Sequence, residues 1–300
     1  SPLAIYETRP INGGHYYRRG WELMVDTKNL VGEFTWDTSL TFSKTNSFWK
    51  ERLPNYDYQI YQQRENEPMS AYYYYNVTGI INTDRSNMPE SQKTLQAEAQ
   101  LPGCPIIEDK NKDGKIDEND VYMKDNSPAI YVGIGNTFTY KRFEFSFFMY
   151  GQFGIQKYNI AYSAAQAGPL AVDYPENSNK FAYRLWNSQT NPNGSRPGLA
   201  IGKMGALPGN AWVNADRENA SFMRMRNITL AYNLAGNILG SLQRYVRNIK
   251  VYVDAQNPFI LTKFQGFDPE IYTGGGGASG GSRGEYPQTR TFSLGVNITF

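Results

Sequence analysis

The residues with the most distinctive chemical spacing lie between positions 109 and 120, in the segment DKNKDGKIDEND. Oxygen-bearing side chains occupy the first, third and fifth positions of this loop, glycine follows at the sixth, and further carboxylates stand at the ninth and twelfth. An EF-hand calcium loop has this spacing, and its seventh residue supplies a backbone carbonyl. The sequence therefore predicts a calcium site formed by Asp109, Asn111, Asp113, Lys115, Asp117 and Asp120.

The loop departs from the EF-hand pattern in two ways. Asp120 stands where a bidentate glutamate is usual, and its shorter side chain makes Mg²⁺ an alternative to Ca²⁺. No flanking helices are expected, because Pro102 and Pro105 precede the loop and strand-like sequence follows it. A bound cation would have a structural role here. The alternative is an acidic turn that binds no metal.

A run of four tyrosines, Tyr72, Tyr73, Tyr74 and Tyr75, is the second candidate site. In a strand, alternate rings of such a run face opposite sides. One interpretation is a surface that contacts ligand or lines a lumen; the other is an aromatic girdle at a membrane interface. Charged residues farther along the chain are either lumen charges or solvated loop and strand ends: Asp216, Arg217, Arg224 and Arg226.

Composition argues against several classes of protein. His15 and Cys104 are the single histidine and the single cysteine, so no internal disulfide can form. No motif of a catalytic nucleophile is recognisable, and an enzyme is the least favoured interpretation. The formal net charge of +2 gives no indication of a nucleic-acid partner.

Strict alternation of apolar and polar residues runs through most of the chain. In the last ten residues Phe292, Leu294, Val296, Ile298 and Phe300 share one face, and polar residues share the other. Similar alternation occupies 21–26, 34–42, 130–140, 143–150, 227–234 and 249–256. Taken alone, the terminal strand suits a soluble sandwich as well as a barrel. The strands together, on the order of ten residues each and with charges on the polar face, favour an all-β, antiparallel transmembrane β-barrel.

The connections between these segments also alternate in length. Short links are expected at 26–33 and 140–143, and long ones at 44–70, 82–128, 158–218 and 259–287. Short turns at one end and long extracellular loops at the other are typical of outer-membrane barrels. A short helix is expected at Gly236–Arg244, between two strands.

Several ordered stretches resemble the SusC/RagA family of TonB-dependent outer-membrane transporters. They are RRGWELMVDTK (18–28), the calcium-like loop, NTFTYKRFEFSFFMYGQFG (136–154), SFMRMRNITLAYNL (221–234), NIKVYVDAQNPFILTKFQGFDPEI (248–271) and YPQTRTFSLGVNITF (286–300). Their order and spacing resemble the C-terminal third of such a transporter.

The resemblance implies a 22-stranded barrel in the outer membrane, closed by a plug that TonB pulls upon. It also implies a SusD-like lipoprotein over the mouth and an oligosaccharide or peptide as cargo. Residues 1–300 are expected to be the C-terminal portion of the barrel, without the plug. The remaining strands and the plug would come from the same or a separate chain. The last strand, ending at Phe300, would be read by the barrel-assembly machinery.

Three functions compete at this point. The first is part of an active importer, moving glycans or peptides with its lipoprotein partner. The second is a small self-contained outer-membrane barrel that acts as a pore or anchor. The third is a soluble calcium-binding adhesion or carbohydrate-binding module, which the length of the strands disfavours.

Overall fold

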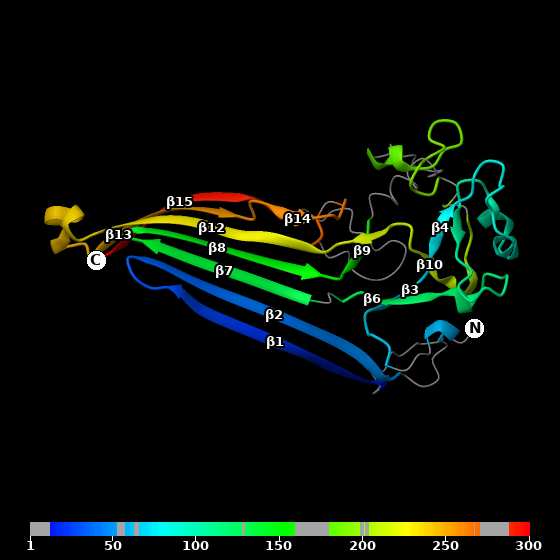
Figure 1. Ribbon diagram of the computed structural model, residues 1–300, viewed down its shortest axis with the longest axis horizontal. Coiled ribbons are helices and arrows are strands. Elements are labelled where there is room, and N and C mark those ends of the chain that lie inside the picture. The colour runs from blue at the N-terminus through cyan, green and yellow to red at the C-terminus, as the bar shows by residue number, and fades with distance from the viewer. Residues whose placement is uncertain are drawn as a thin grey trace, which may run out of the picture.

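The computed structural model describes residues 13–52, 58–62, 66–127, 130–159, 180–198, 201, 204–266, 268–270 and 288–300. Its two regions are a long curved sheet and a lobe at one end of that sheet (Figure 1). No helix within the described residues is long and apolar enough to cross a membrane.

Long antiparallel strands form the sheet, in the order β1-β2-β7-β8-β12-β13-β15. Their bounds are β1 (His15–Leu30), β2 (Phe34–Glu51), β7 (Ile130–Tyr140), β8 (Phe143–Phe153), β12 (Phe222–Ala235), β13 (Asn248–Gln256) and β15 (Thr291–Thr299). The short strand β14 (Ile260–Thr262) also pairs with β12, beyond the end of β13. Each strand therefore lies beside the next long strand along the chain. This is the up-and-down order that short hairpin links produce.

The two ends of the sheet differ in their connections. At one end residues 31–33 join β1 to β2, and Lys141 with Arg142 joins β7 to β8. Lys141 has a positive φ of 53°, which helps the chain reverse within two residues. The predicted helix between β12 and β13 is confirmed as the 3₁₀ segment η9 (Gly236–Arg244), kinked at Gly240. It lies at this same end (Figure 1).

At the other end, the long connections fold into the lobe. Its small sheets are β10-β3-β6, β11-β9 and β4-β5. Their bounds are β3 (Ala71–Tyr75), β4 (Val77–Ile80), β5 (Pro105–Ile107), β6 (Tyr122–Asp125), β9 (Gln156–Tyr158), β10 (Trp212–Val213) and β11 (Arg217–Asn219). Short 3₁₀ segments complete it: η1 (Ile60–Gln62), η2 (Glu90–Thr94), η3 (Ala97–Gln100), η4 (Glu118–Asp120), η6 (Lys180–Arg184) and η8 (Pro208–Asn210).

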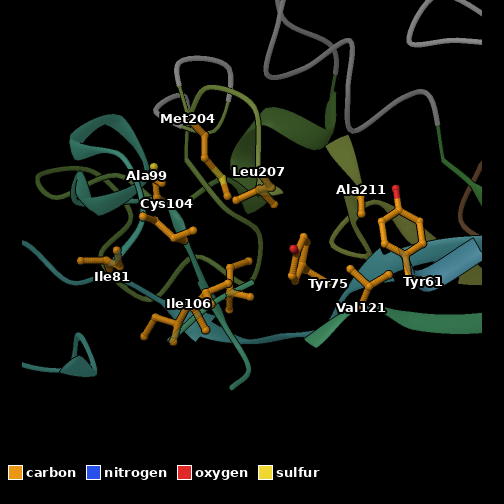
Figure 2. Packing of buried hydrophobic residues seen from close by; sticks show 13 residues of the cluster. Tyr61, Tyr75, Ile81, Ala99, Cys104, Ile106, Val121, Met204, Leu207 and Ala211 are labelled. Carbon is orange, nitrogen blue, oxygen red and sulfur yellow. The ribbon is translucent and has the colours of Figure 1, made fainter. Parts of the chain in front are cut away.

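The hydrophobic core of the chain lies in this lobe (Figure 2). Tyr75, Ile81, Cys104 and Val121 are fully buried there. The core gathers residues of two separate connections, because Met204, Leu207 and Ala211 pack with residues between Tyr61 and Val121. Burial raises the pKa of the Cys104 thiol to about 11, so this cysteine is an inert part of the core.

Two sequence expectations need correction. The strands predicted at 21–26 and 34–42 extend to 15–30 and 34–51, because backbone pairing between β1 and β2 continues past the point where apolar alternation stops. The connections expected at 44–70, 82–128 and 158–218 are not simple loops. Their described parts carry strands, 3₁₀ turns and a shared core.

Candidate functional site

The sheet has one apolar face, and strand register aligns its side chains into rows. One row crosses six strands through Trp36, Phe138, Phe145, Leu230, Val253 and Leu294. Leu230 is 45% exposed and Leu294 is 75% exposed. In water such a surface would be unfavourable, since a contiguous apolar patch this broad requires a covering phase or partner.

The opposite face of the sheet is polar. The row next to the apolar one contains Asp37, Thr137, Ser146, Thr229, Asp254 and Ser293. Thr229 Oγ1 donates to Asp254 Oδ1 at 2.6 Å. Lys250 Nζ lies 2.9 and 3.0 Å from the two carboxylate oxygens of Glu144, so these charges pair across β12. The alternation in the sequence therefore becomes a sheet with two chemically different faces.

A hollow of about 470 Å³ lies on this polar face. Its lining includes Asp26, Lys28, Asp37, Ser146 and Asn227, from β1, β2, β8 and β12. Charged, amide and hydroxyl groups line the hollow together with Phe147 and Phe148, so its surface is mixed.

The five apolar residues of the terminal alternation, four in β15 and Phe300 directly after it, lie where the alternation places them. Phe292, Leu294, Val296, Ile298 and Phe300 are all strongly exposed. In the described part of the chain β15 pairs with β13 alone, and β1 pairs with β2 alone. Among the strands that the structure describes, both outer strands therefore have one edge without a pairing partner.

Tyr72 to Tyr75 form β3 and lie in the lobe, away from the long strands. As expected of a strand, the rings face two sides. Tyr75 is buried and its hydroxyl donates to the carbonyls of Asp117 and Pro208, while Tyr73 packs on Tyr61 at 5.0 Å. Burial raises the pKa of the Tyr75 hydroxyl, so it stays a neutral donor.

The other two rings of β3 belong to a stack with a cation at each end. Tyr72 stacks on Tyr74 with the ring centroids 5.2 Å apart, and Tyr74 stacks on Tyr122 with the centroids 5.8 Å apart. The Arg217 guanidinium lies 3.7 Å from the Tyr72 ring, and Lys110 Nζ lies 4.7 Å from the Tyr122 ring. Ring faces in this stack are occupied by one another and by cations, which ties β3, β6 and β11 together.

The calcium-like loop turns sharply at Gly114, where φ is +83°. Asp109 Oδ2 accepts from Gly114 N at 2.9 Å, and Asp113 Oδ1 accepts from Lys115 N at 2.9 Å. Asn111 Nδ2 donates to Asp113 Oδ2 at 3.0 Å. The side chains at the first, third and fifth positions thus gather around one turn, as the spacing predicts.

The later ligands of the predicted calcium site are engaged elsewhere. Asp117 and Asp120 form a capping box on η4, and the Asp120 side chain is fully buried. The two Asp120 oxygens accept from Lys110 N and Asp117 N, both at 2.8 Å. Within the described residues, no three His, Cys, Asp or Glu side chains converge as a metal site would require. Calcium binding, with Mg²⁺ as the alternative, therefore stays a prediction.

Two of the charged residues considered above are neither lumen charges nor solvated. Arg224 is 3% exposed, donates to both carboxylate oxygens of Asp268 at 2.7 and 2.8 Å, and pairs with Glu270. Asp216 is buried on the link between β10 and β11. Its burial, opposed by Arg196, raises its pKa to about 6. No pattern in the sequence distinguishes these residues from the exposed Arg226.

Comparison with known proteins agrees with the geometry. A TonB-dependent receptor, P3, of Formosa agariphila is 26% identical over 309 residues, covering 96% of this chain and 29% of the relative. The TonB-dependent receptor SusC of Bacteroides thetaiotaomicron is 27% identical over 297 residues, covering 96% of this chain and 27% of the relative. The chain thus spans less than a third of the length of these relatives. No protein-family model matches it.

The fold is also shared with solved transporters. The structure of the RagAB peptide transporter superposes with a TM-score of 0.68 at 19% identity, over 96% of this chain and 29% of that one. The "closed-closed" RagAB peptide importer gives a TM-score of 0.67 at 18% identity, over 96% and 30%. Over the length that it covers, this chain resembles SusC/RagA-like TonB-dependent transporters in sequence and in fold. The predictions of an all-β antiparallel fold and of a protein that is not an enzyme are confirmed.

Proposed function

We propose that this chain forms the C-terminal part of the wall and the outer loops of an active importer in the cell outer membrane. The two-faced sheet carries the proposal, since its apolar rows suit lipid and its polar rows suit a wet transport path. The name of one solved neighbour, the RagAB peptide importer, supports a peptide cargo. An oligosaccharide cargo rests on the resemblance to the SusC/RagA family.

The proposal requires partners at both edges of the sheet. In lipid, unpaired N–H and C=O groups are costly, so β1 and β15 must pair with the remaining strands of a closed, 22-stranded barrel. We place those strands and a plug in the same or a separate chain, with TonB acting through the plug. A SusD-like lipoprotein would cover the lobe end, where the long connections lie.

The apolar residues of β15 have a further role in this proposal, as the signal that the barrel-assembly machinery reads. Removal of Phe300 should therefore impair insertion of the full-length transporter. Normal assembly without Phe300 would contradict that role.

A matched pair of substitutions on β15 tests the membrane assignment. In the full-length transporter, Leu294→Arg places a charge on the apolar face, at a cost of about 2–4 kcal/mol near the bilayer midplane. The amount of folded barrel in outer-membrane fractions should fall sharply, together with cargo uptake. Ser293→Arg places the same charge on the polar face of the same strand.

Ser293→Arg should leave assembly nearly unchanged. Equal loss with both variants would show that the two faces are not divided between lipid and lumen. A wild-type protein that stays soluble without detergent would instead support the calcium-binding or carbohydrate-binding module. A closed barrel formed by this chain alone would support a self-contained pore.

The predicted calcium loop fits the proposal as a brace of the lobe. Asp109, Asn111 and Asp113 supply hard oxygens around the Gly114 turn, and Asp120 anchors the loop to the lobe core. A cation there would stabilise the loop and take no part in transport.

A further inference from the structure

A shallow groove crosses the outer part of the lobe. It lies between β4 and the segment that follows Trp186, and its volume is about 640 Å³. Small-molecule sites commonly have volumes of this size. Strand β4 is at the end of the molecule opposite the short turns of the sheet (Figure 1), so the groove belongs to the loop side of the proposed barrel.

The lining of the groove is partly polar, partly apolar and almost uncharged. Amide and hydroxyl side chains, among them Thr78, Asn82, Asn193 and Ser195, share it with apolar side chains such as the indole of Trp186. Arg196 is the single charged side chain among the described lining residues. It is already engaged, donating to the Ala215 carbonyl and lying 2.8 Å from Glu218 Oε1. The groove therefore suits a neutral ligand.

Several polar groups in the groove have no partner within the described part of the chain. The side-chain carbonyl of Asn82 accepts no hydrogen bond, but this oxygen is buried and is not open to a ligand. The indole N–H of Trp186, the amide of Asn193 and the hydroxyl of Ser195 also make none. An amide and a hydroxyl can each donate and accept, which matches the dual character of sugar hydroxyls.

The segment that carries Trp186 is already held in place. Trp186 N donates to the Arg196 carbonyl at 2.8 Å, and Asn191 Nδ2 donates to the Tyr183 and Leu185 carbonyls at 2.8 Å. The indole packs on Gly103, where an added Cβ would lie 2.8 Å from the ring. A ligand would meet a wall that is formed before it binds, which lowers the entropy cost of binding.

A peptide added as a strand along β4 fits this groove poorly. Strand addition needs a run of free backbone groups at a sheet edge. Here Asn214 Oδ1 accepts from Val77 N at 3.1 Å, and Asn87 Nδ2 donates to the Ile80 carbonyl at 2.8 Å. Both ends of this four-residue strand are thus occupied by asparagine side chains.

We propose that this groove binds a neutral oligosaccharide. A sugar ring has apolar C–H faces, for the Trp186 indole, and hydroxyl edges, for Asn193 and Ser195. The proposal rests on the proposed function in one respect: the groove must face the outside of the cell. The proposal also restricts the expected ligand: of the glycans and peptides considered above, only uncharged glycans would bind in this groove.

The test is binding to the purified full-length transporter in detergent. The probes are neutral oligosaccharides of four to eight sugar units (glucans, xylans, mannans and galactans), with uronate-containing glycans and random peptides as comparison panels. We expect binding within the neutral panel. Trp186→Ala should weaken it about tenfold or more, as loss of a central aromatic contact does. Trp212→Ala removes an exposed tryptophan outside the groove and should leave the affinity unchanged.

Because Trp186 also packs on Gly103, its removal could disturb the lobe. A second variant, Asn193→Ala with Ser195→Ala, alters only exposed rim side chains and should weaken binding about fivefold to tenfold by loss of two hydrogen bonds. Binding of uronates or peptides alone, no binding in the neutral panel, or binding unaffected by both groove variants would overturn the proposal. Failure here, with assembly impaired by Leu294→Arg and preserved by Ser293→Arg, would leave the proposed function intact.

Discussion

The long sheet and the lobe place their apolar side chains in opposite ways. In the lobe Ile107 is 1% exposed, within a core that excludes water. In the sheet Val253 is 48% exposed, and its row continues outward across strand after strand. The lobe is organised like a small soluble domain, whereas no described residues form a second layer over the apolar face of the sheet.

Under the proposed function, this contrast means that one chain is built for two surroundings. The sheet is held by backbone pairing, and its apolar rows would face lipid. The lobe is held by burial of apolar surface and therefore depends on water around it. Substitutions of one chemical type should thus have different effects in the two regions.

The largest effect is expected at Arg224, where β12 runs from the lobe into the sheet. Arg224→Ala would leave the Asp268 carboxylate buried without its cation, which costs about 3–5 kcal/mol. A lower midpoint of thermal unfolding, and faster proteolysis near residues 263–270, should report the loss. Arg226→Ala, two residues along β12 and exposed, is the matched control and should change the midpoint little. Equal effects would contradict the structural role of the buried pair.

The next prediction compares one type of truncation in both regions. Ile107→Ala should destabilise the lobe by about 2–5 kcal/mol, because it opens a cavity in a packed core. Val253→Ala in the sheet should cost less than about 1 kcal/mol in detergent, since its side chain is half exposed. Thermal unfolding of the full-length transporter would measure both. If the two variants lost similar amounts of stability, the difference between a buried lobe core and an exposed sheet face would be contradicted.

A pH-dependent prediction follows from Asp216. Its pKa is raised from 3.8 to about 6 in the folded lobe, so the neutral acid is favoured there. The stability that it contributes is complete below pH 3.8 and is lost as pH rises through about 6. Asp216→Asn should therefore stabilise the lobe at pH 7.5 by at most about 3 kcal/mol, and should give no gain near pH 4. Thermal midpoints at the two pH values measure this.

The exposed carboxylate Glu98 supplies the control for that measurement, through Glu98→Gln. A gain at pH 7.5 from Glu98→Gln as large as that from Asp216→Asn would show that net charge, and not burial of Asp216, is responsible.

The smallest effect is expected at the calcium-like loop. Asp109→Ala with Asp113→Ala removes the oxygens that accept from Gly114 N and Lys115 N, at about 1 kcal/mol for each lost bond. Proteolysis within 109–120 should increase, while the barrel stays assembled. Wild-type protein should bind added Ca²⁺ by calorimetry, and a chelator should reproduce part of the loosening. No heat of binding, and identical proteolysis with and without chelator, would show that the loop works without a metal.

Much of the sheet could be predicted from the sequence, because alternation directly records which side chains share a face. Residues 130–140 formed a strand with the bounds that the pattern indicated. Register added what alternation could not, namely that Glu144 and Lys250 meet across β12. The extension of β2 to Glu51 was missed, since backbone pairing there continues without an apolar pattern.

The lobe could be predicted far less well. Its core joins residues such as Tyr75 and Leu207, which are more than a hundred positions apart and carry no shared periodicity. Buried Arg224 and exposed Arg226 look alike in the sequence, because burial depends on where the segment containing Asp268 folds. The groove at Trp186 was missed for the same reason.

The two-part origin of the lobe core has a consequence for how such chains can diversify. Residues 61–121 belong to the connection between β2 and β7, and Met204, Leu207 and Ala211 to the connection between β8 and β12. In a chimera that exchanges one connection alone, the core residues of the new connection would not fit those of the connection that was kept. The groove is lined by residues of the same two connections. Both connections together therefore determine which ligand it binds. Natural or engineered recombination should give a folded lobe only when both connections are exchanged together.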